Sequence, residues 1–414
     1  MKKSKRKMKK KAKILVIVLV ILALLLVATG ILFMPSRIKL KGKSTIKLAV
    51  GEEYKEKGAT SKYLFFDNTK YIKITGKVDT EKIGTYKIKY SIKEKISKKV
   101  TTKYRTVIVV DNIKPTITLN GGSINLYINK GYTEYGYTAS DNIDGDITDK
   151  VEVKGNIDNT KEGEYILTYK VKDSSDNETK ETRKVTVIKD KTGAKRVPVL
   201  MYHNFYDDTA GETGDNGNWV SKTNFDQQVK YLVDNNYYFP SWPEMYDYIL
   251  GNIALPENSI VLTSDDGHES FFRIAYPIIE KYNVKITSFV VGAWTNKGYI
   301  SNYRKHAYFE SHTFDMHKAG CSGQGHGGYF NCVSYEEGLA DLKKSIELID
   351  NDYAIAYPYG DFNENIRKIT KDSGIKMGFT TAYDYVYPGD DPLELSRIRI
   401  SRDDSLHSFI NKIS

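Results

Sequence analysis

Thr263-Ser264-Asp265-Asp266-Gly267 follows the apolar run Ile260-Val261-Leu262, so two adjacent carboxylates stand where a buried strand is expected to end. Because side chains alternate along a strand, the two aspartates can point in different directions and do different work. One can hold a metal ion while the other stays available as a base. The same residues could equally form an ordinary polar loop, so the assignment depends on the rest of the chain.

The region around this stretch alternates strand-like and helix-like runs. Strands are predicted at Val197–Tyr202, Ile260–Thr263, Ile286–Val291, Ala354–Tyr357 and Gly378–Thr381. Helices are predicted at Phe225–Val233, Ile274–Tyr282, Tyr335–Ile349 and Glu364–Lys371. This alternation is typical of a parallel sheet or barrel, in which functional groups gather at the carboxyl ends of the strands. Asp265 and Asp266 follow one such end, and His203 follows another.

Two further stretches carry candidate functional residues. Ser311-His312-Thr313-Phe314-Asp315-Met316-His317 contains two histidines five positions apart, a spacing that does not share a regular helix face but allows convergence from a turn. With one aspartate they offer two imidazoles and one carboxylate, a set that suits zinc and leaves a position open for water. Ala356-Tyr357-Pro358-Tyr359-Gly360-Asp361 again ends a strand, and its loop can present a backbone N–H to an oxyanion.

In this order the three stretches resemble the motifs of the polysaccharide deacetylases of carbohydrate esterase family four, over roughly residues 197–402. The first is similar to T-F-D-D-G, the second to the histidine motif and the third to R-x-P-Y-G. The resemblance implies a distorted (β/α) barrel and metal-assisted hydrolysis of an acetyl amide. Asp266, His312 and His317 would hold one divalent ion, expected to be zinc. Asp265 would be the base, and the Tyr359 backbone N–H would stabilise the oxyanion.

The departures from the family pattern also carry information. Ala356 stands where the third motif has the arginine that normally tethers the base, and the motifs D-x-x-[D/E]-W and L-x-x-H are not visible. The stretch Val197-Pro198-Val199-Leu200-Met201-Tyr202-His203 is similar to the branch that includes poly-N-acetylglucosamine deacetylases. That branch has a histidine in the same Met-Tyr-His context, so His203 is the candidate acid for the leaving amine. His203 could instead only support a loop, which would turn attention to His268.

The only two cysteines, Cys321 and Cys332, flank a Gly-rich loop. The uncharged segment at residues 14–34 is expected to anchor the chain with this domain outside the cell, where thiols oxidise, so the pair is predicted to form a disulfide that holds this loop. The alternatives are two unpaired thiols, or a metal-binding role for the cysteines or for His326.

Residues 35–190 contain an internal repeat. Gly76–Tyr90 aligns with Gly155–Tyr169, and both copies alternate apolar and polar residues as small β-sandwiches do. The second copy, residues 112–190, resembles the immunoglobulin-like repeats of bacterial surface proteins, and the first copy, residues 35–111, is a degenerate version. Neither copy contains His, Cys or Trp, so a stalk is predicted, with a glycan- or partner-binding module as the alternative. Asp141, Asp144 and Asp146 could bind calcium, although turn capping is the simpler interpretation.

The first residues predict a membrane anchor. Residues 1–13 are strongly basic, and Ile14–Met34 follow without a charged side chain. A helix of that length spans roughly 30 Å, one hydrocarbon core, whereas the apolar region of a cleaved signal peptide has about 7–15 residues. We therefore expect an uncleaved single-pass anchor with the leader in the cytoplasm and the remainder outside. A cleavable signal peptide is the alternative.

The net charge of +10 lies almost entirely in the leader, so it does not indicate a nucleic-acid partner. The first repeat, which follows the anchor, is nevertheless rich in lysine. It could contact anionic lipid head groups or anionic wall polymers, or simply form a solvated basic surface.

The predicted protein is multi-domain, with a transmembrane helix, two immunoglobulin-like β-sandwiches and a C-terminal distorted (β/α) barrel. Its segments are the basic leader (1–13), the anchor (14–34), the repeats (35–111 and 112–190), a linker (191–196) and the deacetylase domain (197–414). The predicted function is N-deacetylation of peptidoglycan N-acetylglucosamine, because anchor and stalk keep the enzyme near the wall. The alternatives are an exopolysaccharide substrate such as poly-N-acetylglucosamine, and a catalytically inactive glycan-binding adhesin.

Overall fold

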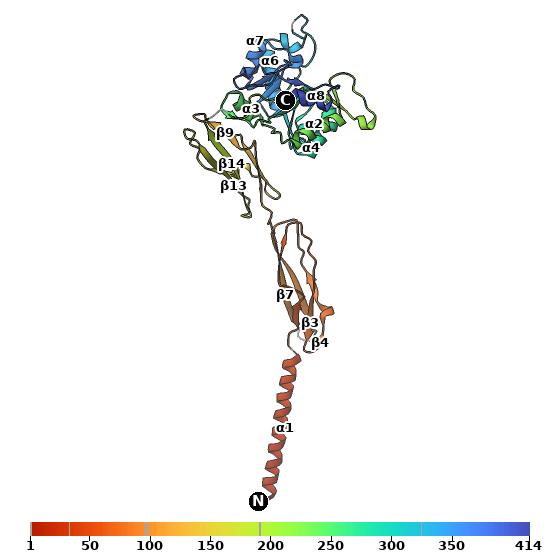
Figure 1. Cartoon of the computed structure of the whole chain (residues 1–414). Helices are drawn as coiled ribbons and strands as arrows, with labels where there is room; N and C mark the ends of the chain where they lie inside the picture. The colour runs from red at the N-terminus through yellow and green to blue at the C-terminus, as the bar shows by residue number, and fades with distance from the viewer. Residues whose placement is uncertain (1, 33, 96–97, 190–191, 324) are drawn as a thin grey trace. The chain divides into compact units, whose positions relative to one another are not determined.

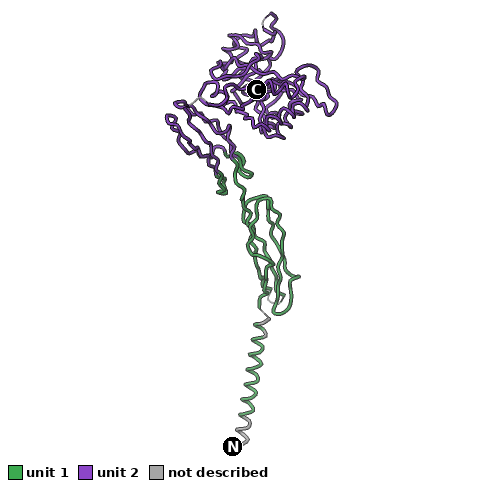
Figure 2. Tube along the Cα trace, viewed as in Figure 1, with its two compact units in different colours: residues 1–116, 140–147, 172–179 green, residues 117–139, 148–171, 180–414 purple. Residues whose placement is uncertain are grey.

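The computed structural model describes residues 2–32, 34–95, 98–189, 192–323 and 325–414. The chain divides into two compact units that alternate along the sequence (Figure 2). Unit 1 contains residues 1–116, 140–147 and 172–179, and unit 2 contains residues 117–139, 148–171 and 180–414. Residue 33 of the predicted anchor and the predicted domain boundary at residues 190 and 191 lie outside the described residues.

Unit 1 begins with one continuous helix, α1 (Lys2–Leu32), which runs through the basic leader into the uncharged segment (Figure 1). Within the described ranges, no helix combines the length and the apolar character that crossing a membrane requires.

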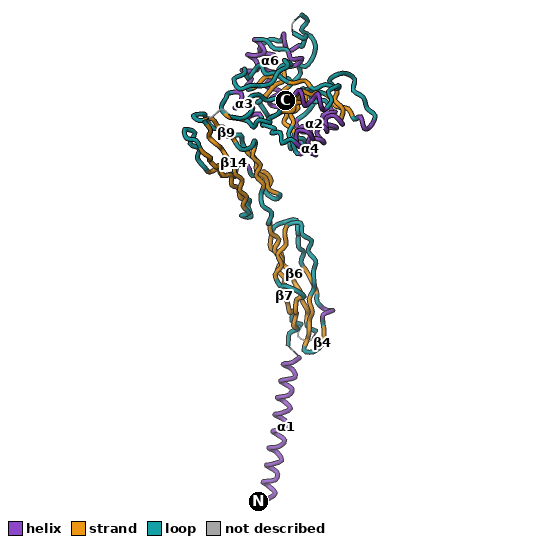
Figure 3. The backbone as a smooth tube through the Cα atoms, in the orientation of Figure 1, coloured by secondary structure: helices purple, strands orange, loops and turns teal. Residues whose placement is uncertain are grey.

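The first repeat is a sandwich of two sheets in unit 1 (Figure 3). Their strand orders are β1-β3-β4 and β2-β7-β6-β5. The strands are β1 (Arg37–Leu40), β2 (Thr45–Ala49), β3 (Ala59–Tyr63), β4 (Phe66–Asp67), β5 (Lys73–Thr75), β6 (Gly84–Lys93) and β7 (Val100–Val110). Alternate residues of β6 and β7 are buried between the sheets, as the period-two pattern predicts. Arg105 is fully buried there and lies 2.8 Å from Glu56.

The second repeat has the same plan, with strand orders β11-β10-β8 and β12-β13-β14-β9. The strands are β8 (Thr116–Leu119), β9 (Ile124–Tyr127), β10 (Tyr137–Asp141), β11 (Gly145–Asp146), β12 (Glu152–Lys154), β13 (Gly163–Lys172) and β14 (Glu178–Ile188). Its buried Arg183 lies 3.2 Å from Glu134, the counterpart of the first repeat's ion pair. The internal repeat predicted from sequence is therefore a repeat of fold and of buried polar chemistry.

Within unit 2 the second repeat is packed on the C-terminal domain, a contact that the sequence did not predict. β18 (Ile253–Ala254) of the C-terminal domain extends the sheet by pairing antiparallel with β9. The hydroxyl of Tyr135 donates to Asp247 Oδ2 at 2.9 Å, and both residues are buried. The backbone N–H of Gly122 contacts Glu244 Oε1 at 3.3 Å. Part of the predicted stalk is thus packed against the C-terminal domain.

The C-terminal domain is built on seven parallel strands in the order β23-β22-β21-β20-β19-β15-β24. They are β15 (Val199–Tyr202), β19 (Val261–Ser264), β20 (Ile286–Val290), β21 (Ala307–Ser311), β22 (Ala354–Ala356), β23 (Met377–Phe379) and β24 (Ile398–Arg399). The two edges are joined, because Leu395 bridges to Phe379 of β23 and Ile398 pairs with Leu200 of β15. The sheet therefore curls on itself, as the predicted distorted barrel requires. The five predicted strands are present, whereas β21 and β24 were not predicted.

Helices cover the outside of this sheet. They are α2 (Lys222–Asp234), α3 (Trp242–Ile249), α4 (Tyr276–Tyr282), α5 (Lys297–Ser301), α6 (Tyr335–Ile349), α7 (Glu364–Ser373) and α8 (Leu406–Ile413). α6 packs against α7, and α2 packs against α4 and α8 (Figure 1). The larger apolar core includes Phe205, Phe225 and Ile279. A short parallel pair of strands, β16 (Asn204–Tyr206) and β17 (Trp219–Ser221), follows β15 in the sequence.

Candidate active site

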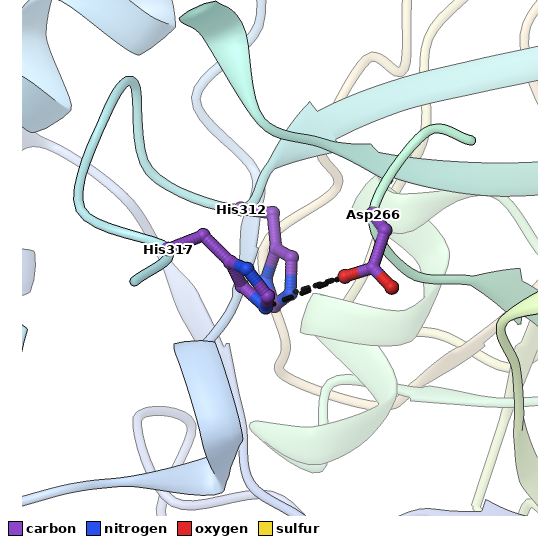
Figure 4. A group of neighbouring side chains, drawn as sticks. All are labelled: Asp266, His312 and His317. Carbon is purple, nitrogen blue, oxygen red and sulfur yellow. Dashed lines mark ion pairs between the residues drawn. The ribbon is translucent and has the colours of Figure 1, made fainter. Parts of the chain in front are cut away.

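The predicted metal-binding side chains converge beyond the carboxyl ends of β19 and β21, which lie on either side of β20 in the sheet. Asp266 follows β19, and His312 directly follows β21. The Nε2 atoms of His312 and His317 lie 3.4 Å and 3.3 Å from the same Asp266 oxygen, Oδ1 (Figure 4). One ligand atom of each residue lies within 4.8 Å of the other two. The structure therefore brings together the three residues that the sequence motifs singled out.

The loops that carry this site are conformationally constrained. Asp266, Thr313 and Tyr359 all have positive φ angles, of 74°, 68° and 62°. Such left-handed conformations are costly for residues with a Cβ atom and concentrate at functional sites. Gly267 also has positive φ, and a Cβ atom there would lie 2.8 Å from Val290 Cγ1, so the chain needs glycine at this turn.

His312 is oriented by the backbone of the third stretch. Its Nδ1 lies 2.7 Å from the carbonyl oxygen of Ala356, which can only accept, so Nδ1 donates and Nε2 faces Asp266. Burial alone would lower the pKa of His312, but the hydrogen bond to Asp266 and the two nearby carboxylates raise it. The site thus favours positive charge beside Nε2, and a metal ion can supply that charge in place of a proton.

His317 and Asp266 also have pKa values that favour the protonation states suited to metal binding. Burial, followed by the nearby charge of His312, lowers the pKa of His317 to about 4, so its ring is neutral near pH 7. Burial alone would raise the pKa of Asp266, but the hydrogen bond and charge of His312 hold it well below its usual value. A neutral imidazole and an ionised carboxylate are the forms that bind metals.

Asp265 points to a different partner from its neighbour. Both of its oxygens accept from Arg397, with Nη1–Oδ1 and Nη2–Oδ2 distances of 2.7 Å each. Arg397 is fully buried, and its Nε donates to the Thr380 carbonyl at 3.2 Å. Burial alone would raise the pKa of Asp265, but the charge and hydrogen bonds of Arg397 hold it below its usual value. Arg397 therefore provides the tether that Ala356 cannot.

Sequence reasoning missed Arg397. It lies 132 positions from Asp265, in the segment that joins the two edges of the sheet. The available signal was the alternating run Arg397-Ile398-Arg399-Ile400, in which a strand with one arginine facing inward could have been suspected.

The residues predicted from sequence to form the site line one cavity of about 360 Å³. Its walls include all six of the predicted catalytic and metal-binding residues: His203, Asp265, Asp266, His312, His317 and Tyr359. Asn218 and Arg399 also line it and were not assigned roles from sequence. His326, considered from sequence only as an alternative metal ligand, lines it too but is not part of the Asp266–His312–His317 group. The Tyr359 ring stacks on His317, with centroids 5.1 Å apart.

Of the two histidines considered as acids, His203 is the one that lines this cavity. Its Nδ1 is buried and has no hydrogen-bond partner among the described residues. Burial lowers the pKa of His203, while the charges of Asp265 and Asp266 act in the opposite direction. His268 instead contacts Ser270 Oγ at 2.8 Å and packs edge-on against Trp219.

The predicted disulfide between Cys321 and Cys332 is confirmed, with the two Cα atoms 5.8 Å apart. Asp361, at the end of the third stretch, holds the enclosed loop by accepting from the backbone N–H groups of His326 at 2.6 Å and Gly328 at 2.8 Å. The loop, of which residue 324 lies outside the described residues, thus brings the His326 side chain to the cavity.

Comparisons with known proteins identify the families that two parts of the chain match. Residues 252–378 match the polysaccharide deacetylase family, and residues 38–109 and 117–187 match the immunoglobulin-like domain of bacterial surface proteins. A putative polysaccharide deacetylase of Bacillus subtilis, YxkH, is 28% identical over 214 residues, which cover 50% of this chain and 72% of that protein.

A poly-beta-1,6-N-acetyl-D-glucosamine N-deacetylase of Staphylococcus aureus is 28% identical over 211 residues, covering 47% of this chain and 71% of that protein. A solved Streptococcus pyogenes deacetylase, PplD, in complex with acetate, is 25% identical with a TM-score of 0.46, covering 53% of this chain and 98% of that chain. In the sequence of this chain, two bacterial surface immunoglobulin-like domains therefore precede a deacetylase domain. The chain is a polysaccharide N-deacetylase.

Proposed function

We propose that this chain is a metal-dependent N-deacetylase of an extracellular glycan, with peptidoglycan N-acetylglucosamine as the first candidate substrate. One observation carries the proposal: a single cavity contains an Asp266–His312–His317 group and an aspartate clamped by a buried arginine. Metal-assisted amide hydrolysis needs both parts, a site for a Lewis acid and a general base beside it.

The residues present fit a zinc ion. Two imidazoles and one carboxylate, with an open side toward the cavity, form a donor set typical of catalytic zinc. The bond from His312 Nδ1 to the Ala356 carbonyl is the kind of outer contact that orients a zinc-binding histidine. A divalent ion bound there would activate water and polarise the acetyl carbonyl.

The protein's own groups account for the remaining proton transfers. Asp265 takes a proton from the attacking water, and Arg397 keeps that carboxylate ionised and aligned. The Tyr359 backbone N–H stabilises the oxyanion. His203, in its protonated form, donates a proton to the nitrogen of the leaving amine as the C–N bond breaks, and the charges of Asp265 and Asp266 favour that form against the effect of burial.

Peptidoglycan is placed first because the predicted anchor and the repeats would keep the enzyme near the wall. We infer that residues 14–34 are the anchor, from their length without charge, and that the remaining domains are extracellular. The Cys321–Cys332 disulfide supports an oxidising location. In this setting the lysine-rich first repeat would contact anionic wall polymers.

Poly-N-acetylglucosamine is the second candidate substrate. It is favoured by the Staphylococcus aureus relative, which is named for that activity. A catalytically inactive adhesin is disfavoured because each predicted site residue is present and lines the cavity.

Acetate release by the purified full chain, loaded with zinc, tests the proposal on a panel of glycans. The panel contains peptidoglycan, poly-N-acetylglucosamine, chitin oligomers and acetyl-xylan. We expect the fastest release from peptidoglycan, with loss of activity on chelation and recovery with zinc. Preference for poly-N-acetylglucosamine would select the second candidate, and preference for acetyl-xylan would indicate ester hydrolysis. A zinc-loaded chain that releases no acetate from any substrate would support the adhesin.

A further inference from the structure

A second group of acidic side chains lies in unit 1, far along the chain from the catalytic residues. Asp111 follows β7, Asp141 ends β10 and Asp173 follows β13. One carboxylate oxygen of each lies within 4.8 Å of the other two. The residues are only 8%, 9% and 6% exposed. Negative charge on three carboxylates brought this close with little water around them is mutually repulsive, so the arrangement favours a cation between them.

Asp141 provides an independent sign of a missing ligand. Its Oδ1 accepts from the backbone N–H groups of Ile143 at 2.8 Å and Asp144 at 3.0 Å, which closes a turn. Its Oδ2 is buried and has no hydrogen-bond partner within the described part of the chain. A buried carboxylate oxygen without a partner is costly. The nearby Asn177 amide donates to Asp173 Oδ2 at 2.7 Å instead, and the other two members of the cluster are carboxylates, so a cation is the partner that would satisfy Asp141 Oδ2.

The neighbouring charged groups have other partners. Lys172, next to Asp173, directs its Nζ to Asp176 at 3.7 Å and Glu178 at 4.0 Å. The Asp144 carboxylate accepts from Ser174 N at 2.6 Å and Ser174 Oγ at 2.7 Å. Of the three aspartates considered from sequence, only Asp141 therefore belongs to this cluster, and its companions come from two distant segments.

The first repeat shows that the fold does not itself require this cluster. Tyr63, at the end of β3, stands where the second repeat has Asp141 at the end of β10. Glu94, after β6, stands where it has Asp173 after β13. Glu94 Oε1 accepts from the backbone N–H of Ser36 at 3.0 Å, so its carboxylate is satisfied within the protein.

We propose that Asp111, Asp141 and Asp173 bind one Ca²⁺ ion. Calcium takes hard oxygen ligands at about 2.3–2.6 Å, so two oxygens on one ion can be at most about 5 Å apart, which accommodates this cluster. Asp111 lies between the two matched immunoglobulin-like segments, whereas Asp141 ends strand β10 of the second repeat and Asp173 directly follows its strand β13. The ion ties the connecting segment to those loops.

Calcium binding to the zinc-loaded full chain tests this proposal, with equilibrium dialysis against ⁴⁵Ca²⁺ as the measurement. We expect one Ca²⁺ per chain, with a dissociation constant of about 10⁻⁴–10⁻³ M, as in extracellular modules. Asp141→Asn keeps Oδ1 for the turn and removes only the charge at Oδ2, so it should weaken binding by about tenfold or more. Asp173→Asn should do the same.

Asp176→Asn is the matched control, because Asp176 lies in the same loop as Asp173 with a side chain 90% exposed. It should bind Ca²⁺ as the unmodified chain does. The proposal is overturned if the unmodified chain binds no Ca²⁺, if Mg²⁺ at equal concentration displaces it, or if Asp141→Asn and Asp173→Asn bind like the control.

Hydrogen exchange gives a second readout that does not depend on the variants. Ca²⁺ should slow exchange of the Ile143, Asp144, Ser175 and Asn177 amides, which donate to the ligand carboxylates. Unchanged exchange at these four amides in saturating Ca²⁺ would also contradict the site.

Discussion

The two sides of the catalytic cavity differ in how exposed their charged side chains are and in how they are paired. On one side, the Asp266 and His317 side chains remain 22% and 18% exposed and face each other across a gap that an ion can enter. On the other side, Asp265 is 4% exposed and both its oxygens are bound to Arg397. Adjacent residues of one turn thus serve two purposes: one side is open to a ligand, and the other preserves and aligns a charge.

Substitutions in the Asp266–His312–His317 group, on the open side, should have the largest effect on activity. Asp266→Asn and His312→Ala should each lose zinc and reduce acetate release to background, a greater loss than the about 10²–10³-fold cost of removing one oxyanion donor. Zinc content by mass spectrometry and initial rates of acetate release measure the two effects. His407→Ala, at an exposed position of α8, is the matched histidine control and should change neither. A His312→Ala chain that still holds stoichiometric zinc would refute the ligand assignment.

Substitutions that disrupt the Asp265–Arg397 pair, on the closed side, should leave zinc bound but reduce both activity and stability. Arg397→Ala leaves the Asp265 charge buried without its partner, a change that typically costs about 3–5 kcal/mol of folding free energy. Arg397→Lys keeps the charge but loses the bidentate geometry, so turnover should fall while folding is largely retained. Urea unfolding and acetate release measure these effects, with the partly exposed Arg402→Ala as control. Normal turnover in Arg397→Lys would show that alignment by Arg397 is unimportant.

The same ion pair predicts the direction of a pH effect. The pKa of Asp265 is lower in the folded chain than in the unfolded one, where aspartate titrates near about 3.9. Its stabilisation is therefore present above that pH and is lost as pH falls through the folded pKa. In chelator-treated protein, the melting temperature of the unmodified chain should fall more steeply in acid than that of Asp265→Asn. Parallel curves would contradict the lowered pKa.

His203 lines the same cavity and interacts electrostatically with both aspartates, and its removal should have an intermediate effect on turnover. His203→Ala should retain zinc and lower kcat by about 10²-fold or more, within the range for general acid catalysis. The same substitution at His268 should have less effect, because His268 contacts Ser270 and Trp219 instead. Near-normal turnover in His203→Ala would reverse the assignment in favour of His268.

The smallest effect on turnover is expected from shortening the chain, which leaves both sides of the cavity intact. A fragment beginning at residue 191 should remain active on small oligomers but lose activity on the wall of intact cells. It should also be less stable than a fragment beginning at residue 112, because Asp247 loses its buried bond from Tyr135, at about 1–3 kcal/mol for such a group. Equal melting temperatures would show that this packing contributes little. A folded but inactive shorter fragment would show that the repeats contribute to the site.

The contrast between the two sides also explains what sequence could predict. Asp265, Asp266, His312, His317 and Tyr359 lie in short stretches at strand ends, so residue type and spacing were enough to select them. The pairing of Cys321 with Cys332 was similarly constrained, because no other cysteine exists. The repeated β-sandwich followed from period-two alternation, which the structure confirms in β6, β7, β13 and β14.

What sequence could not predict depends on contacts between distant segments. Arg397 precedes a strand of only two residues, and β18 is equally short, so neither has enough periodicity to be recognised. The cluster of Asp111, Asp141 and Asp173 is also assembled by the fold from three separate segments. In each case a local pattern identified one partner, and only the three-dimensional packing identified the other.

The central claim is that Asp265 and Asp266 do different work, and paired asparagine substitutions test it most directly. Zinc content and acetate release should be measured on the same samples of Asp265→Asn and Asp266→Asn. We predict that Asp265→Asn retains about one zinc ion per chain yet releases no acetate, whereas Asp266→Asn loses both. If Asp265→Asn lost its zinc as Asp266→Asn does, or if either variant kept normal turnover, the proposed division of roles would be wrong.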